Sequence, residues 1–288
     1  MTNKSDSPTT THRGIYLLPN LLTTAGLFSG FFAIVSSMNS QFEAAAIAIF
    51  VAMIFDGLDG RVARMTNTQS PFGAEYDSMA DIVSFGVAPA IVTYNYGLSS
   101  LGKFGWLAAF IYVACAALRL ARFNTQIGVA DKRYFQGLAS PAAAAVIASL
   151  VWTGVGYEMN GHDYSIPLAI ITAFCGLMMV SNFRYSSFKE LDLRGKVPFV
   201  AVLLIVLAFT LVATSPAEIL LAVFAIYAVS GPIITIKTVK KLKLEHVVGD
   251  NTDEELNEET ITKNDNSKDS SSKKEPTKKA ATKEDKKD

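Results

Sequence analysis

Four aspartates stand between two strongly apolar runs of this chain, and together they could bind metal ions. They are Asp56, Asp59, Asp77 and Asp81, within the stretch DGLDGRVARMTNTQSPFGAEYDSMAD. A carboxylate inside a membrane helix costs roughly 2.5–3.5 kcal/mol on insertion scales, so four of them need a compensating partner. A cation is the natural partner, and the stretch therefore predicts a metal site embedded in a membrane.

The spacing of the aspartates predicts that they share one face on each of two helices. Asp56 and Asp59 are three residues apart, and Asp77 and Asp81 are four apart. Both spacings bring two side chains to the same helix face. At about 1.5 Å per residue, Asp59 and Asp56 lie roughly 7 and 12 Å from the loop end of the first helix. Asp77 and Asp81 lie roughly 6 and 12 Å from the loop end of the second helix. Two antiparallel helices would thus present their carboxylates at matching depths.

The ligand types indicate which cation the site would bind. Carboxylates without histidine or cysteine select hard cations such as Mg²⁺, Mn²⁺ or Ca²⁺. Four carboxylates can hold two ions about 3.5–4 Å apart, the arrangement that clamps a phosphoryl group during displacement. Arg61 and Arg64 supply positive charge for a phosphate, although arginine at a helix end is usually only a topology signal. A path for ions or protons is the alternative, because acids inside membranes also mark transporters.

The segments that must carry these aspartates are membrane helices. Half of the 288 residues are hydrophobic and 18% are charged, which suits a polytopic membrane protein better than a soluble domain. We predict an all-α bundle with about eight transmembrane helices, since about 20 residues cross a hydrocarbon core. The predicted spans are roughly 16–38, 42–63, 75–96, 104–123, 138–157, 165–183, 197–214 and 217–236.

The distribution of lysine and arginine orients these spans. With eight spans, Lys103 lies alone on one side, and every other lysine and arginine of residues 1–244 lies on the other. The positive-inside rule then places both termini and the aspartate loop in the cytoplasm, with the chain in the cell membrane. Residues 1–14 are predicted to be a polar segment, 15–244 the membrane domain, and 245–288 a disordered charged tail.

The aspartate stretch resembles the signature of the CDP-alcohol phosphatidyltransferases, D-x-x-D-G-x-x-A-R, a spacer, then G-x-x-x-D-x-x-x-D. This chain fills every position, with Gly60, Ala63, Arg64 and Gly73 beside the four aspartates. The resemblance implies that those four residues line the site for the CDP group. It also implies a six-helix catalytic core, a homodimer, and a reaction in which a hydroxyl attacks the phosphorus of a CDP-linked lipid and CMP leaves.

The same resemblance assigns roles to the carboxylates. It implies two divalent cations, Mg²⁺ or Mn²⁺, bound by Asp56, Asp59 and Asp77. Asp81 would be the general base that takes the proton from the attacking alcohol, and it could also contact a metal. No histidine or cysteine stands near the aspartates in the sequence to form a covalent intermediate, which favours direct in-line transfer.

Further stretches resemble the membrane-embedded phosphatidylserine synthases of this family. They are GIYLLPNLLTTAGLFSGFFAI, YDSMADIVSFGVAPA, LRLARFN and FQGLASPAAAA, the last departing from an expected GLPSP run at Ala139. A serine acceptor needs cations for its carboxylate, and Arg119 and Arg122 share one helix face with Asn124 close behind. The alternative for both arginines is that they reach lipid phosphates. Asn20 and Thr23 could complete the CDP and phosphate site, and Ser84, Gln136 and Ser140 could complete the acceptor site, although each could instead be a helix cap or a packing hydroxyl.

The sequence therefore predicts an enzyme that makes phosphatidylserine and CMP from CDP-diacylglycerol and L-serine, with membrane lipid and no nucleic acid among its partners. The nearest alternative is a sister transferase that uses glycerol 3-phosphate, inositol or inositol phosphate. A transporter would need acids in the later spans, yet between residues 165 and 236 the acids are Glu190, Asp192 and Glu218, in loops or at span ends. A non-catalytic scaffold would leave four buried carboxylates unexplained.

Overall fold

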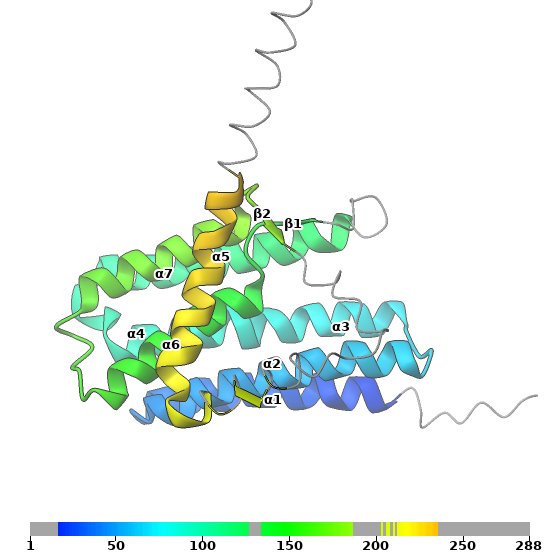
Figure 1. Ribbon diagram of the computed structural model, residues 1–288, viewed down its shortest axis with the longest axis horizontal. Coiled ribbons are helices and arrows are strands. Elements are labelled where there is room, and N and C mark those ends of the chain that lie inside the picture. The colour runs from blue at the N-terminus through cyan, green and yellow to red at the C-terminus, as the bar shows by residue number, and fades with distance from the viewer. Residues whose placement is uncertain are drawn as a thin grey trace, which may run out of the picture. The chain divides into compact units, whose positions relative to one another are not determined.

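The computed structural model describes residues 17–126, 134–186 and 212–235, together with residues 203, 206, 207 and 210. The predicted polar segment 1–14, the tail 245–288 and most of the seventh predicted span lie outside the described residues. The helices are α1 (Leu17–Met38), α2 (Phe42–Met65), α3 (Pro71–Asp81), α4 (Ala88–Tyr96), α5 (Lys103–Gln126), α6 (Ser140–Gly156) and α7 (Ser165–Val180), followed by a helix over Pro216–Thr235 (Figure 1).

The prediction of a helical membrane bundle is confirmed. Three described helices are long and apolar enough to cross a membrane by themselves: α1, α5 and the Pro216–Thr235 helix. The apolar helices α6 and α7 are shorter, with 17 and 16 residues. The predicted third span is built from three consecutive pieces, which are α3, a π-helical turn η2 (Ile82–Val87) and α4.

The first two helices pack closely because small residues line their interface. Gly26 of α1 faces α2, where an added Cβ would lie 3.5 Å from the Cβ of Phe55 and 3.6 Å from the carbonyl oxygen of Ala52. One turn along, Gly30 faces η2 instead, and an added Cβ there would lie only 2.7 Å from the Cα of Ser84. The Gly26–Gly30 pair thus lets α1 approach α2, which carries the first two aspartates, and η2, which follows the last one.

The loop between α2 and α3 is closed by a helix cap. Ser70 has extended backbone angles, and its hydroxyl accepts a hydrogen bond of 3.0 Å from the N–H of Gly73. Pro71 opens α3, where its missing N–H costs no helical hydrogen bond. The cap fixes the residue at which α3 starts, and therefore how far along the helix axis Asp77 and Asp81 lie from the loop.

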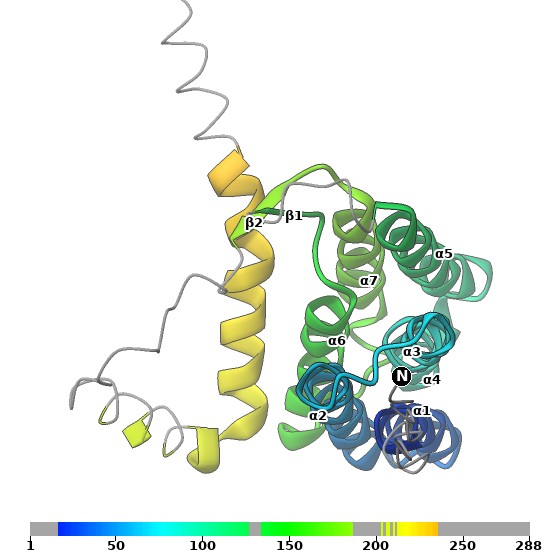
Figure 2. The same cartoon turned by 90° about the vertical axis from the view of Figure 1, so that its right-hand side faces the viewer.

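The Ala-rich helix α6 lies at the centre of the packing. Its buried residues include the run from Ala142 to Ser149, and it contacts both α2 and α7 (Figure 2). Alanine side chains allow neighbouring helices to approach on several sides at once. This explains why the fifth predicted span is rich in alanine.

One feature was not predicted, a short antiparallel pair of strands. β1 (Tyr134–Gln136) pairs with β2 (Arg184–Ser186), with Gln136 opposite Arg184. Strands of three residues are too short to leave an alternating pattern in the sequence. Within β2, the fully buried Tyr185 donates a hydrogen bond of 2.9 Å to the carbonyl of Ala228, and its ring occupies the space beside Gly231. The pair thereby connects the Pro216–Thr235 helix to the helices before it.

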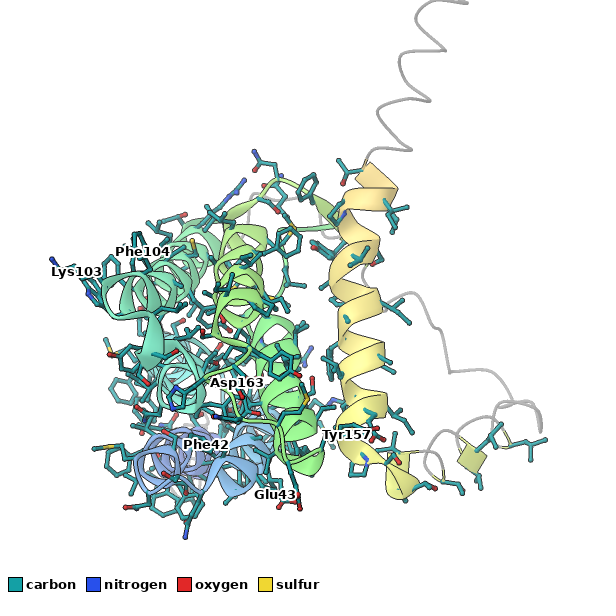
Figure 3. All side chains as sticks on the ribbon, turned by 90° about the vertical axis from the view of Figure 1, so that its left-hand side faces the viewer. Phe42, Glu43, Lys103, Phe104, Tyr157 and Asp163 are labelled. Atoms are coloured by element: carbon teal, nitrogen blue, oxygen red, sulfur yellow. The ribbon has the colours of Figure 1, made fainter. Side chains whose placement is uncertain are left out.

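The connections between helices fall at two opposite ends. Residues 39–41, 97–102 and 157–164 lie at one end, and the loop 66–70 and the end of α5 lie at the other (Figure 1). Figure 3 views the first of these ends and labels Phe42, Glu43, Lys103, Tyr157 and Asp163 there. The alternation agrees with the order of the predicted spans from α1 to α7.

Candidate metal and phosphate site

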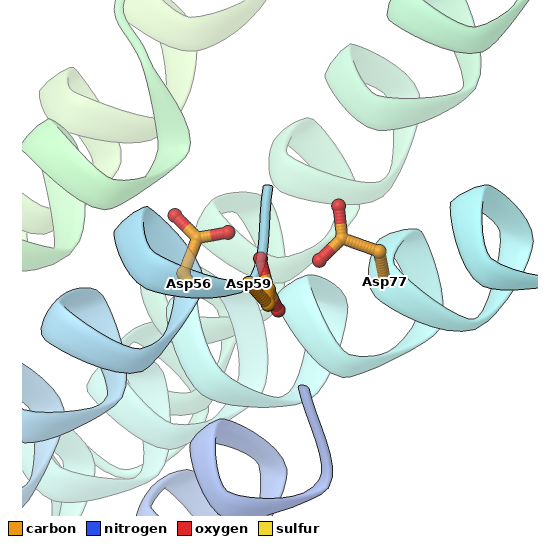
Figure 4. A group of neighbouring side chains, drawn as sticks. All are labelled: Asp56, Asp59 and Asp77. Atoms are coloured by element: carbon orange, nitrogen blue, oxygen red, sulfur yellow. The ribbon is translucent and has the colours of Figure 1, made fainter. Parts of the chain in front are cut away.

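Three carboxylates from two helices meet at one point. Asp56 and Asp59 come from α2 and Asp77 comes from α3, and one oxygen of each lies within 4.8 Å of the others (Figure 4). Asp59 is almost completely buried, with 4% of its surface exposed. Three converging carboxylate oxygens form a ligand set for a hard divalent cation, so these residues fit the metal that the sequence predicts.

Asp81 stands one helical turn beyond Asp77 and belongs to the same cavity. Its carboxyl group shares a hydrogen bond with that of Asp56. The cavity is lined by all four aspartates and, on its inner side, by small or apolar residues that include Gly26, Ala52 and Ala80. The structure therefore brings the four predicted carboxylates together around one cavity.

Helix α1 contributes a hydroxyl to this cluster. The Oγ1 of Thr23 donates to Oδ2 of Asp59 at 2.7 Å, and it also lies 3.1 Å from the carbonyl oxygen of Pro19 in the preceding turn. The sequence placed Thr23 with the nucleotide and phosphate residues, and its contact in the structure is to a predicted metal ligand. Thr23 therefore orients the Asp59 carboxylate.

The helix surface between the aspartates and the loop is open. An added Cβ at Gly57 or Gly60 would meet nothing within 4 Å. Beside them Arg64 is exposed and donates from Nε to the Gly60 carbonyl at 2.8 Å, and Ala63 is half-buried. Opposite, on α3, an added Cβ at Gly73 would lie 3.5 Å from Oδ1 of Asn20. The predicted nucleotide residues thus surround an open approach to the carboxylates.

The two arginines of α5 are held by neutral groups. Arg119 donates from Nη1 to the hydroxyl of Ser140 at 2.9 Å, and its buried Nε has no hydrogen-bond partner. Arg122 donates from Nη2 to the side-chain oxygens of Gln136 and Asn182, the latter at 2.8 Å, and Nη1 lies 3.5 Å from the Val180 carbonyl. Across the described residues, neither guanidinium has a carboxylate within salt-bridge distance.

The two remaining predicted acceptor residues, Asn124 and Ser84, contact different helices. Asn124 contacts α3, because its amide donates to the hydroxyl of Ser78 at 3.0 Å. Ser84 donates to the Gly26 carbonyl of α1 at 3.2 Å and lines the aspartate cavity. Sequence reasoning missed Asn182, which completes the surroundings of Arg122. Asn182 stands two residues after the end of α7, and that position at a helix end was the signal that could have indicated it.

Comparison with known proteins identifies the family. The family model for CDP-alcohol phosphatidyltransferase matches residues 16–177. The chain belongs to this family. The matched region contains all seven helices from α1 to α7 up to Leu177, and with them the four aspartates and both arginines.

Curated members of this family resemble the chain over most of their length. The CDP-diacylglycerol–serine O-phosphatidyltransferase of Helicobacter pylori strain J99 is 38% identical over 218 residues, which is 75% of this chain and 90% of the relative. The enzyme of the same name from Methanocaldococcus jannaschii is 37% identical over 178 residues, 62% of this chain and 78% of the relative. The archaetidylserine synthase of Methanothermobacter thermautotrophicus is 35% identical over 170 residues, 58% and 69% of the two chains.

Proposed function

We propose that this protein is a CDP-diacylglycerol–serine O-phosphatidyltransferase, which transfers the phosphatidyl group of CDP-diacylglycerol to the hydroxyl of L-serine and releases CMP. The relatives at 37–38% identity carry that name. The structural observation that supports the proposal best is the cavity that all four signature aspartates line. Membership of a transferase family also argues against the transporter alternative.

In this proposal Asp56, Asp59 and Asp77 hold two divalent cations, Mg²⁺ or Mn²⁺. When bound, such ions neutralise a diphosphate and stabilise the departing phosphate. The protein's own contribution is to fix the three carboxylates before substrate arrives. Asp59 is buried and hydrogen-bonded to Thr23, so its orientation is already set. Such preorganisation avoids a reorganisation cost during the reaction.

Asp81 acts as the general base in the proposed mechanism. Its carboxylate accepts the proton of the serine hydroxyl, whose oxygen forms a bond to the lipid-side phosphorus of the diphosphate. The bond from that phosphorus to the bridging oxygen breaks, and CMP leaves with that oxygen. Asp81 lies one turn deeper along α3 than Asp77 and lines the same cavity, so an acceptor could be held beside it while the diphosphate stays with the other carboxylates.

The nucleotide binds at the open, loop-facing side of the aspartates. Gly60 leaves the backbone of α2 accessible there, since an added Cβ would meet nothing within 4 Å, and Gly73 lies opposite, beside the Ser70 hydroxyl and Asn20. Arg64, Ala63 and Asn20 stand around this opening and complete the proposed CDP site. The arginine is exposed and can turn its guanidinium toward a phosphate.

The serine carboxylate is recognised by Arg119 and Arg122. Both guanidiniums donate hydrogen bonds to neutral oxygens, and the Asp81 carboxylate lies close enough to interact electrostatically with Arg119. Ser140, Gln136 and Asn182 orient them, and Asn124 ties the same helix to α3 through Ser78. The phosphate of glycerol 3-phosphate or inositol phosphate would suit the same charges, which keeps a sister transferase as the second candidate.

The proposal places the enzyme in the cell membrane with the aspartate end facing the cytoplasm. Arg61, Arg64, Arg119 and Arg122 all belong to the end that carries the 66–70 loop, and Lys103 belongs to the opposite end. The positive-inside rule favours this orientation. The eight-span count, the membrane domain over residues 15–244 and the homodimer remain parts of the proposal.

The test is CMP release by the purified protein from CDP-diacylglycerol with Mg²⁺ or Mn²⁺. Serine, glycerol 3-phosphate, inositol and inositol phosphate are supplied in separate reactions. Release with serine alone, together with phosphatidylserine as the lipid product, supports the proposal. Release with a different acceptor alone would replace serine by that acceptor, and no release with any of them from folded protein would refute the transferase assignment.

A further inference from the structure

The helix that carries Asp81 changes its hydrogen bonding immediately after that residue. In η2 the bonds skip one residue more than in an α-helix, as in the bond from the N–H of Ala88 to the carbonyl of Val83. A π-helical turn inside an α-helix is rare and often occurs at functional sites. Pro89 stands directly after this turn and has no N–H to donate, so this part of the helix has one backbone hydrogen bond fewer.

A tyrosine from another helix donates a hydrogen bond to this turn. The hydroxyl of Tyr112 in α5 donates to the Phe85 carbonyl at 3.0 Å. Tyr112 is 0% exposed, so it cannot contact a substrate in the cavity. The phenol thus gives this buried carbonyl a hydrogen-bond partner from another helix.

The same turn is also held from α1. Ser84 donates to the Gly26 carbonyl, and Gly30 leaves no room for the turn to move toward α1. On the α5 side, an added Cβ at Gly86 would lie 3.2 Å from the Cβ of Ala116, so the two backbones approach closely. The turn is therefore fixed between two helices at a point directly adjoining Asp81.

We propose that Tyr112 is a positioning residue for Asp81. By bonding to the Phe85 carbonyl, it fixes the π-helical turn and thus the depth and rotation of Asp81 in the cavity. Asp56, Asp59 and Asp77 precede the turn in the sequence, and Thr23 of α1 holds Asp59. Tyr112 also shares a face of α5 with Arg119, seven residues along, so one helix sets the relative positions of the proposed base and the proposed acceptor site.

This inference rests on the proposed function of Asp81, and the test compares two tyrosines that each donate to a carbonyl. Tyr112→Phe removes the bond to the turn. Tyr96→Phe is the control, since the Tyr96 hydroxyl donates to the Met159 carbonyl at 2.8 Å at the other end of the helices. For each variant, kcat and the KM for CDP-diacylglycerol are measured, and Mn²⁺ affinity is taken from the shift in thermal unfolding without substrate.

For Tyr112→Phe we expect kcat to fall about tenfold or more, because small displacements of a reacting group are costly. Its KM for CDP-diacylglycerol and its Mn²⁺ affinity should stay within about twofold of wild type, since a general loosening would change all three. Tyr96→Phe should keep its kcat. If Tyr112→Phe does not fold, Ser84→Ala removes the other hydroxyl that holds the turn and should give the same selective loss of kcat.

An unchanged kcat in folded Tyr112→Phe would overturn the inference. So would a fall in kcat that is matched by an equal loss of Mn²⁺ affinity, or one that Tyr96→Phe reproduces. The wild-type reactions with different acceptors distinguish a failure of this inference from a failure of the proposed function. If wild type uses another acceptor and not serine, the serine assignment fails, and the comparison of the two tyrosines is made with that acceptor.

Discussion

The hydroxyl of Thr23 on α1 lies 2.7 Å from the buried carboxylate of Asp59 on α2. A donor on the second oxygen of a metal ligand sets the direction in which the first oxygen points. We expect Thr23→Val to weaken Mn²⁺ affinity about ten- to hundredfold, as is typical for such supporting groups. Thr23→Ser keeps the hydroxyl and should retain most of the affinity. The Mn²⁺ dependence of CMP release measures both, and equal losses in the two variants would contradict the hydrogen-bonding role.

Asp81→Asn tests the general base. The amide is nearly the same size as the carboxyl group and cannot accept a proton from the alcohol. We expect turnover to fall by about two to four orders of magnitude. Binding of the CDP nucleotide should persist, because it depends on the other end of the cavity. Isothermal titration with CDP and the rate of CMP release report the two properties, and normal turnover would remove this role from Asp81.

Arg122→Gln tests the acceptor site. The guanidinium has three neutral oxygen partners, so its charge is available to an anion, and glutamine can keep part of the hydrogen bonding without the charge. We expect the KM for serine to rise about tenfold or more, in line with the loss of a charged hydrogen bond. The KM for CDP-diacylglycerol should stay unchanged. An equal rise in both KM values would instead indicate a role in holding the fold together.

Metal binding should raise the thermal stability of the protein. A ligand that binds the folded state raises the free energy of unfolding, by about 2.7 kcal/mol at a hundred times its dissociation constant. Saturating Mn²⁺ should therefore raise the unfolding temperature of the wild-type protein in detergent, and a chelator should reverse it. Asp77→Asn removes one of the three converging carboxylates and should lose most of this rise. The same rise in that variant would place the ion elsewhere.

Gly30→Ala tests the contact between α1 and η2. The added methyl group would lie 2.7 Å from the backbone of Ser84, so one of the two segments must move. Overpacking of this kind costs about 1–3 kcal/mol of stability. Gly156→Ala is the matched control, because an added Cβ there meets nothing within 4 Å. Thermal unfolding of the two variants should differ, and equal midpoints would mean that α1 adjusts freely.

The parts of this protein that could be predicted are those set by local pattern. Apolar runs of fixed length identified the helices, and the spacing of Asp56, Asp59, Asp77 and Asp81 indicated the faces that meet in one cavity. The helix that carries the second pair begins at Pro71, four residues before the predicted span 75–96. These signals depend on residues close together in the sequence, and a chain confined to a membrane has few alternatives to helices.

The parts that could not be predicted depend on contacts between distant segments. Thr23 was placed with the phosphate and binds Asp59, and Ser84 was placed with the acceptor and binds Gly26. In each case the residue type indicated a polar contact, but only the packing of α1 decides its partner. Pro89 could have indicated the irregular turn, whereas the tyrosine that completes it comes from another helix and left no local signal.

The contact between Thr23 and Asp59 also bears on how the chain enters the membrane during synthesis. By itself, α2 is a poor candidate for insertion, because a carboxylate costs up to about 2.5–3.5 kcal/mol in hydrocarbon and α2 carries two of them in its second half. The preceding helix is apolar, long enough to span, and carries a hydroxyl that meets the more buried of the two acids. We therefore expect the translocon to release α1 and α2 into lipid together, as one hairpin. In that hairpin the hydroxyl of α1 would stabilise the buried acid of α2.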